Sequence, residues 1–102
     1  MKLSTRIENQ TGIIELDGDF TFETQGAFRI SSAAMLATPN LQRMVLDLSR
    51  VSRMDASSLG ALLILRESCQ TRNTALALRN PPPQTLALLS LVHFEKLFEL
   101  LP

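Results

Sequence analysis

The sequence has no tryptophan and no tyrosine, and it has only one cysteine and one histidine. A lone cysteine, Cys69, cannot form an internal disulfide, and it suits a protein of a reducing compartment. The lone histidine, His93, has no second histidine or nearby cysteine with which to bind a metal ion. The composition therefore predicts neither a disulfide framework nor a metal site, and it implies no cofactor.

Charge of one sign and long hydrophobic runs are also missing. Ten lysine and arginine residues balance ten aspartate and glutamate residues, so no basic surplus exists to neutralise nucleic acid or anionic lipid. The longest strongly apolar run, 59–65, falls far short of the roughly 20 residues that cross a bilayer. The first ten residues lack the apolar segment of a secretory signal. We expect a cytoplasmic protein without nucleic acid or membrane insertion.

Signatures of enzymes are sparse. The four glycines, at positions 12, 18, 26 and 60, are too scattered for a phosphate-binding loop. A hydrolase with Ser57 as nucleophile would need His93 as its base, and no Gly-x-Ser-x-Gly turn surrounds Ser57. Cys69 falls in a helical pattern without an adjacent base, so we interpret it as a packing residue. We therefore predict that the chain is not an enzyme.

The residues that are present suffice for one folded domain over 1–102. A chain of 102 residues with 45% hydrophobic residues is of common domain size and can bury a core. No linker or repeat divides it, and the triple proline at 81–83 is interpreted as a turn because few residues follow it.

Hydrophobic periodicity predicts alternating strands and helices. Strands are expected at 2–8, 13–18, 43–49 and 74–80, with a hairpin turn at 9–12 and a short edge strand at 97–102. Helices are expected at 21–37, 57–71 and 84–91. This order predicts an α/β fold: a mixed β-sheet of four to five strands, with an N-terminal antiparallel pair and helices packed on the sheet.

Several finer expectations follow from the same pattern. The nearly unbroken apolar strand 43–49 is expected to be covered on both faces, and 50–56 is expected to be a loop. Apolar residues of the first helix, among them Phe22, Phe28, Ile30, Met35 and Leu36, are expected to share one face. In the third helix, Leu86 and Leu89 are expected to face inward. Thr21 or Thr24 is expected to cap the first helix.

Polar residues gather between the third strand and the second helix. Ligands of α/β sheets usually bind at such a strand-to-helix loop. Ser57 and Ser58 fall in the first helical turn, where free N–H groups and the positive end of the helix dipole favour a negative group. A phosphoryl group on Ser57 would gain those donors, whereas an unmodified serine would only cap the helix. The local chemistry leaves both interpretations open.

Neighbouring residues are equally ambiguous from local chemistry. Asp55 is either a turn residue beside the cap or a group that positions the hydroxyl. Asp47 with Ser49 favours a scaffold role at the strand end. A glycine inside a helix lowers helix stability by about 1 kcal/mol relative to alanine. The presence of Gly60 therefore indicates either a close approach by a partner or close packing against the sheet.

The stretch "MVLDLSRVSRMDASSLGALLILRE", residues 44–67, resembles the signature of STAS domains, the family of bacterial anti-sigma-factor antagonists. Asp47 and Ser49 match its Asp-x-Ser pair, Asp55 its second acid, and Leu59 and Gly60 its helix start. The order of expected elements and the C-terminal "LFEL" are also similar, so the resemblance covers nearly the whole chain.

The resemblance implies a role for individual residues. The family's phosphoacceptor is the hydroxyl two residues after the second acid, which is Ser57 here, with Ser58 as an alternate site. Ala56 stands where serine or threonine is frequent. Thr21 stands where the family has an acid facing the partner kinase, and strand alternation points Asp19 the other way.

The resemblance also implies partners. The unphosphorylated chain would bind an anti-sigma factor or related serine kinase, which would phosphorylate it, and a serine phosphatase would restore it. This would be partner switching, a form of signal transduction in transcription regulation. Alternatively, the chain would be a constitutive subunit of a transport ATPase or of a larger signalling assembly. The sequence leaves homodimer formation through an edge strand open.

Overall fold

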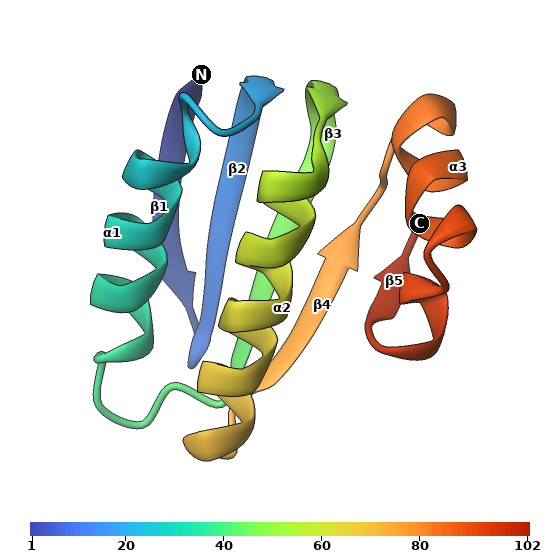
Figure 1. Cartoon of the computed structure of the whole chain (residues 1–102). Coiled ribbons are helices and arrows are strands. Elements are labelled where there is room, and N and C mark those ends of the chain that lie inside the picture. The colour runs from blue at the N-terminus through green and yellow to red at the C-terminus, as the bar shows by residue number, and fades with distance from the viewer.

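The computed structural model describes all residues from 1 to 102 (Figure 1). Its elements, in chain order, are β1 (Lys2–Glu8), β2 (Thr11–Phe20), α1 (Gln25–Leu36), β3 (Arg43–Met54), α2 (Ala56–Thr71), β4 (Ala75–Arg79), α3 (Pro83–Leu91), the short 3₁₀ turn η1 (Phe94–Lys96) and β5 (Glu99–Leu101).

The five strands form one mixed sheet in the order β1-β2-β3-β4-β5. β1 and β2 are antiparallel, and every later neighbour is parallel. Asn9 and Gln10 close the hairpin with φ values of 48° and 70°, as a tight two-residue turn between antiparallel strands requires. The predicted α/β class, antiparallel pair and C-terminal edge strand are confirmed.

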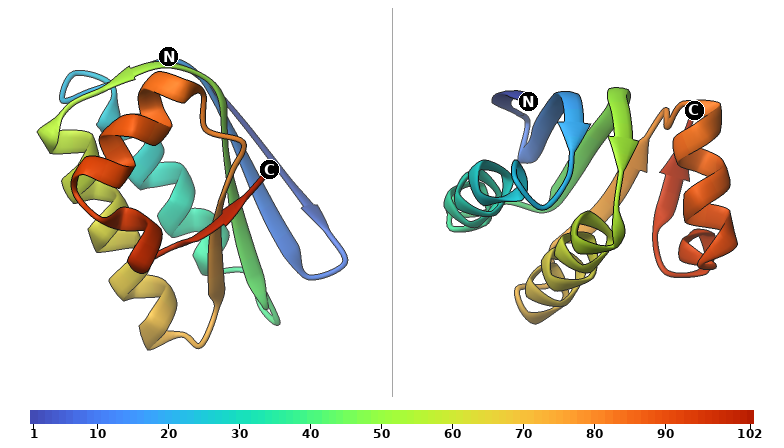
Figure 2. Two further views of the ribbon diagram at one scale, coloured as in Figure 1. Left: turned by 90° about the vertical axis from the view of Figure 1, so that its right-hand side faces the viewer. Right: turned by 45° about the horizontal axis from the view of Figure 1, so that its top comes forward.

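All three helices lie on one face of the sheet (Figure 2). The main core lies between them and that face, and it contains Leu46 and Leu48 of β3, Leu62 of α2 and Leu89 of α3, all with no exposed surface. No helix has the length and apolar character needed to span a membrane.

The prediction that β3 is covered on both faces is confirmed for its middle, where Met44, Val45 and Leu46 are all buried, but helices cover only one of the faces. The helix-free face instead buries a small apolar row of Ile13, Val45 and Ala77. Long charged side chains pair beside this row, and their aliphatic stems can cover it. The pairs are Arg6 with Glu15, Arg79 with Asp47 at 3.0 Å, and Arg43 with Glu99 at 3.0 Å.

The prediction of a loop at 50–56 is wrong, because β3 continues to Met54. Its pairing with β2 shifts between Glu15 and Asp17, and again between Gly18 and Asp19, so that β3 carries extra, bulged residues. Asp47 Oδ1 accepts a hydrogen bond from Ser49 N at 2.9 Å inside the first bulge. The Asp-x-Ser pair therefore shapes a bulged strand, and the polar residues beyond it face solvent.

The first helix begins later than predicted. β2 extends past the expected end at Gly18, whose φ of 113° fits the second bulge, and α1 starts only at Gln25. Phe22 therefore precedes the helix and is 69% exposed.

Two further side chains expected in the core point outward. Ile30 is 75% exposed and Leu86 is 40% exposed. In α1 the buried residues are Phe28, Ser32, Met35 and Leu36, so the apolar Phe28, Met35 and Leu36 do form the buried face, and Ile30 lies outside it.

Cys69 provides a test of the packing. Its side chain is buried against Met44, with 3.9 Å between the two sulfurs, and burial raises the pKa of the thiol to about 11. We expect a thiol reagent such as 5,5′-dithiobis(2-nitrobenzoate) at pH 8 to react with Cys69 only as fast as the protein opens, and at once in denaturant. Equal rates in folded and unfolded protein would contradict this packing.

Candidate functional site

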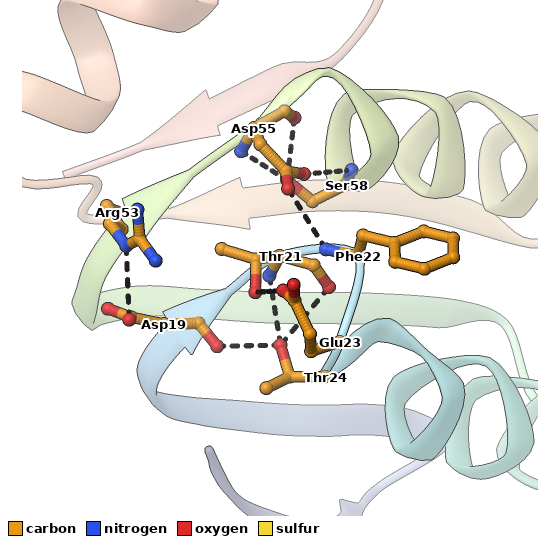
Figure 3. A network of polar contacts seen from close by, with 8 residues as sticks. All are labelled: Asp19, Thr21, Phe22, Glu23, Thr24, Arg53, Asp55 and Ser58. Atoms are coloured by element: carbon orange, nitrogen blue, oxygen red, sulfur yellow. Dashed lines mark hydrogen bonds and ion pairs between the residues drawn. The ribbon is translucent and has the colours of Figure 1, made fainter.

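The candidate site lies where the ends of β2 and β3 meet the starts of α1 and α2 (Figure 3). The parallel register brings Phe20 at the end of β2 beside Met54 at the end of β3. The β2–α1 segment, 21–24, and the start of α2 are thereby side by side.

Asp55 starts α2 as its N-cap. Its Oδ1 accepts from Ser58 N at 3.0 Å, and Ser58 Oγ accepts from Asp55 N at 3.0 Å. This reciprocal pair is a capping box, which satisfies two backbone N–H groups that the helix itself cannot. Local polar residues do cap this helix, but the expectation that Ser57 would be the cap is wrong: Asp55 is the N-cap and Ser58 is its partner, because the two lie three residues apart.

The two serines have different surroundings. Ser58 has no exposed surface, and its hydroxyl also donates to the main-chain oxygen of Asp55 at 2.8 Å. Ser57 is half-buried, and its Oγ accepts a hydrogen bond from the side chain of Gln25 on α1. Ser58 is therefore an internal part of the helix start, whereas the Ser57 hydroxyl lies near the surface between two helices.

Asp55 also binds the segment opposite. Its Oδ2 accepts from Phe22 N at 3.0 Å (Figure 3). Hydrogen bonds from the backbone N–H groups of Ser58 and Phe22 lower the pKa of the Asp55 carboxyl, because they favour its charged form. The carboxylate thus connects α2 to the β2–α1 segment.

Thr21, where the resemblance implies an acid, is buried with 4% exposure. Its Oγ1 donates to Glu23 Oε2 at 3.1 Å, so a carboxylate lies beside this position although the residue itself has none. Thr24 is the N-cap residue of α1, but its hydroxyl accepts from Thr21 N at 2.9 Å and donates to Asp19 O at 2.8 Å. These bonds close the 21–24 turn instead of capping α1.

Asp19 is held away from the serines. Its Oδ2 pairs with Arg53 Nε of β3 at 3.1 Å (Figure 3). Both side chains are well exposed, so the pair adds little stability.

The structure does not bring Asp47 and Ser49 to this group. The Asp47 side chain alternates with the core-facing Leu46 and Leu48, and it pairs with Arg79 on the helix-free face. Burial opposes ionisation, yet bonds from Ser49 and Arg79 leave the pKa of the Asp47 carboxyl below its usual value. The sheet therefore separates this carboxylate from Ser57.

The remaining motif residues flank the serines on α2. Ala56 is exposed, and Leu59 packs against the main core. A Cβ atom added at Gly60 would meet nothing within 4 Å. Close packing against the sheet therefore does not explain Gly60, and the approach of a partner remains as its interpretation.

Sequence reasoning missed Gln25 and Glu23. Gln25 contacts Ser57 across 32 positions of the chain, so no local pattern indicated the pair. Glu23 follows Thr21 by two residues in the turn before α1, and this short spacing could have indicated that its carboxylate lies beside Thr21. No group of three or more His, Cys, Asp or Glu side chains is placed to hold a metal ion.

Comparison with known proteins gives one family. The family described as "Mlab, STAS domain" matches residues 3–102. A STAS-domain containing protein of Pseudomonas aeruginosa (strain UCBPP-PA14) is 32% identical over 93 residues, covering 91% of this chain and 90% of that protein.

Solved structures share the fold at low sequence identity. An anti-sigma factor antagonist from Mycobacterium paratuberculosis has a TM-score of 0.88 at 20% identity, over 99% of this chain and 85% of its own. Phosphorylated SpoIIAA of Bacillus has a TM-score of 0.76 at 16% identity, and the match covers 99% of this chain and 92% of SpoIIAA. A sulfate transporter family protein from Wolinella succinogenes has a TM-score of 0.79 at 23% identity, and the match covers 94% of this chain and 80% of that protein's chain.

The different surroundings of the serines predict different costs of substitution. Ser58→Ala removes a buried hydroxyl that accepts from Asp55 N, so we expect the free energy of unfolding to fall by about 1–2 kcal/mol. Ser57→Ala loses only a half-exposed contact, so we expect a change below about 0.5 kcal/mol. Urea unfolding measures both, and equal losses would contradict the assignment of Ser58 to the capping box.

Asp55 predicts a pH dependence of stability. The pKa of the Asp55 carboxyl in the folded protein lies below the ordinary 3.8. The ionised carboxylate therefore makes its full contribution to the free energy of unfolding above about pH 5, and this contribution is lost as the pH falls through the folded pKa. We expect the difference in unfolding free energy between wild type and Asp55→Asn to be constant from pH 7 to 5 and to shrink below pH 3.8. Other carboxylates titrate in both proteins and cancel. A difference that stays unchanged to pH 2.5 would contradict the bonds to this carboxylate.

Proposed function

Because the chain belongs to the STAS domain family, we propose that it is a protein-binding module, not a catalyst, controlled by reversible phosphorylation of Ser57. The observation that carries the proposal is the half-buried Ser57 hydroxyl at the start of α2, next to a Ser58 hydroxyl that is fully buried and bonded. Only the first of the two can meet a kinase without unfolding the helix start.

Phosphorylation would change the charge of this surface. A kinase would transfer the terminal phosphoryl group of ATP to Ser57 Oγ, with release of the hydroxyl proton, and the product would carry about 1.5–2 negative charges at pH 7. The positive end of the α2 dipole favours such a group. The Asp55 and Glu23 carboxylates nearby make the whole edge strongly negative.

A charge of this size would break a tight protein contact. A partner that packs against unmodified Ser57 would have to desolvate the phosphate, and it would meet repulsion if its own surface is acidic. Hydrolysis by a phosphatase would restore the hydroxyl and the contact. The kinase supplies the ATP, so the chain itself needs no cofactor, and we place the switch in the cytoplasm.

The partner we propose is an anti-sigma factor with serine kinase activity, so that the chain acts in transcription regulation. Two structural neighbours support this: one is named an anti-sigma factor antagonist, and SpoIIAA has been solved in a phosphorylated form. Thr21 with Glu23 replaces the family's acid at this edge, which would adapt the contact to a particular partner.

A second candidate is a constitutive subunit of a transport assembly. The likeness to a sulfate transporter family protein favours it. Neighbouring genes for a sigma regulator, kinase or phosphatase would favour the switch, and transporter genes would favour the subunit.

Two substitutions at Ser57 test the switch. Ser57→Ala keeps the surface neutral and Ser57→Asp adds a charge, so we expect the first to retain the partner and the second to lose at least about 90% of it. The measurement is quantitative mass spectrometry of proteins co-purified from native cells with each tagged variant.

The matched control is Ser90→Asp, which adds the same charge at an exposed serine on α3. It should retain the partner. If Ser57→Ala and Ser57→Asp retain the partner equally, the switch is refuted and the constitutive subunit is favoured.

A further inference from the structure

The outward surface of α1 and α2 carries several exposed apolar side chains, and the charged residues of the two helices are Arg29 of α1 and Arg66 and Glu67 of α2. Arg29 is the sole charged residue of α1, and the exposed Ile30 follows it. On α2, the exposed Leu63 and Ile64 lie three and four residues after Gly60, and so beside it on the helix surface. A helix face turned to water usually carries polar and charged residues. This surface has the composition of one that another molecule covers.

A groove of about 430 Å³ runs between the two helices. Its lining includes Arg29 of α1 and Ala61 of α2. Gln25 and Ser57 lie four residues before these two, one helical turn nearer the helix starts. The hydrogen bond between Gln25 and Ser57 therefore stands at one end of the groove.

The groove is apolar along its floor and cationic at its rim. Six of its ten lining residues are hydrophobic, two are arginines, and none is acidic. Arg29 and Arg72 form no ion pair, and Arg72 Nη1 reaches only the main-chain oxygen of Leu36, at 3.3 Å. A complementary ligand would supply both apolar groups and carboxylates.

Gly60 makes this surface flat beside Ser57. A Cβ atom there would meet nothing within 4 Å, so the chain's own packing does not require glycine inside α2. A glycine on a helix surface lets a second backbone come close.

We propose that the groove binds an amphipathic helix of the partner protein, with its apolar side chains on Ile64 and its carboxylates at Arg29 and Arg72. The backbone of that helix would come closest to α2 at Gly60. This inference rests on the proposed function, because it assigns the partner's chemistry. A phosphate on Ser57, at the end of the groove, would repel an acidic helix, whereas it would attract a basic one.

A protein helix fits these features better than a membrane surface does. The chain has no net charge, and two arginines give little attraction to anionic lipid. A groove between two helices also matches the shape of a third helix, a common mode of recognition.

Photo-crosslinking in native cells tests the occupant. With p-benzoylphenylalanine at Ile64, we expect one adduct, to a partner segment with apolar residues every three to four positions and at least two carboxylates among them. Adducts with lipid, with a second copy of this chain or with a basic segment would overturn the proposal. So would the absence of any adduct at Ile64.

Binding of the purified partner tests the geometry. Gly60→Gln should weaken binding about tenfold or more while raising the Tm by about 2–4 °C, because glutamine favours a helix. Ala87→Gln, at an exposed position of α3, is the control and should leave the dissociation constant unchanged. Because Gly60→Gln stabilises the fold, misfolding cannot account for its loss of binding.

Charge reversal tests the proposed contact of the partner's carboxylates with the two arginines independently. Arg29→Glu with Arg72→Glu should weaken binding about tenfold or more, whereas Lys96→Glu, at an exposed residue of η1, should not. If these variants and Gly60→Gln bind normally while Ser57→Asp does not, the groove is refuted and the switch stands. If Ser57→Asp binds normally and the groove variants do not, the switch is refuted and the groove stands.

Discussion

The Asp55 carboxylate joins the two segments from which the site is built. One oxygen accepts from Ser58 N and starts α2, and the other accepts from Phe22 N in the turn that leaves β2. Both hydrogen bonds require the ends of β2 and β3 to lie side by side. The bulges in β3 shift the register of the two strands so that Phe20 pairs with Met54. The Asp-x-Ser pair at Asp47 and Ser49 forms a hydrogen bond within the first of these bulges. The motif residues thus hold the backbone around one half-buried hydroxyl, that of Ser57.

In the proposed function the adjacent serines have separate roles, Ser58 in structure and Ser57 in regulation. Ser58 is fixed in the capping box, so modifying it would require the helix start to open. Ser57 is positioned by the same helix turn without holding it together, and its contact is with a side chain of α1. A charge at Ser57 therefore changes the outer surface while the Asp55 bonds can remain. A switch that keeps its own fold intact is reversible at little cost.

Features with a local cause were predictable from the sequence. A polar cap at the start of α2 was predictable from the local residues, although the sequence pointed to Ser57 and the cap is formed by Asp55 and Ser58, three residues apart. Features set by distant partners were not predictable: Arg53 looked like part of a loop, yet pairing with β2 makes it strand. The contact between Gln25 and Ser57 joins two helices and has no local pattern. The motif itself predicted the position of the candidate phosphoacceptor, while the fold alone distinguished its surroundings from those of Ser58.

The central claim is that Ser57 is the regulated hydroxyl. The most direct measurement is phosphosite mapping by mass spectrometry of the protein isolated from its native cells in several growth states. We expect phosphate at Ser57 in at least one state, a changed fraction between states, and none at Ser58. Phosphate at Ser58, or an unmodified Ser57 in every state, would contradict this account.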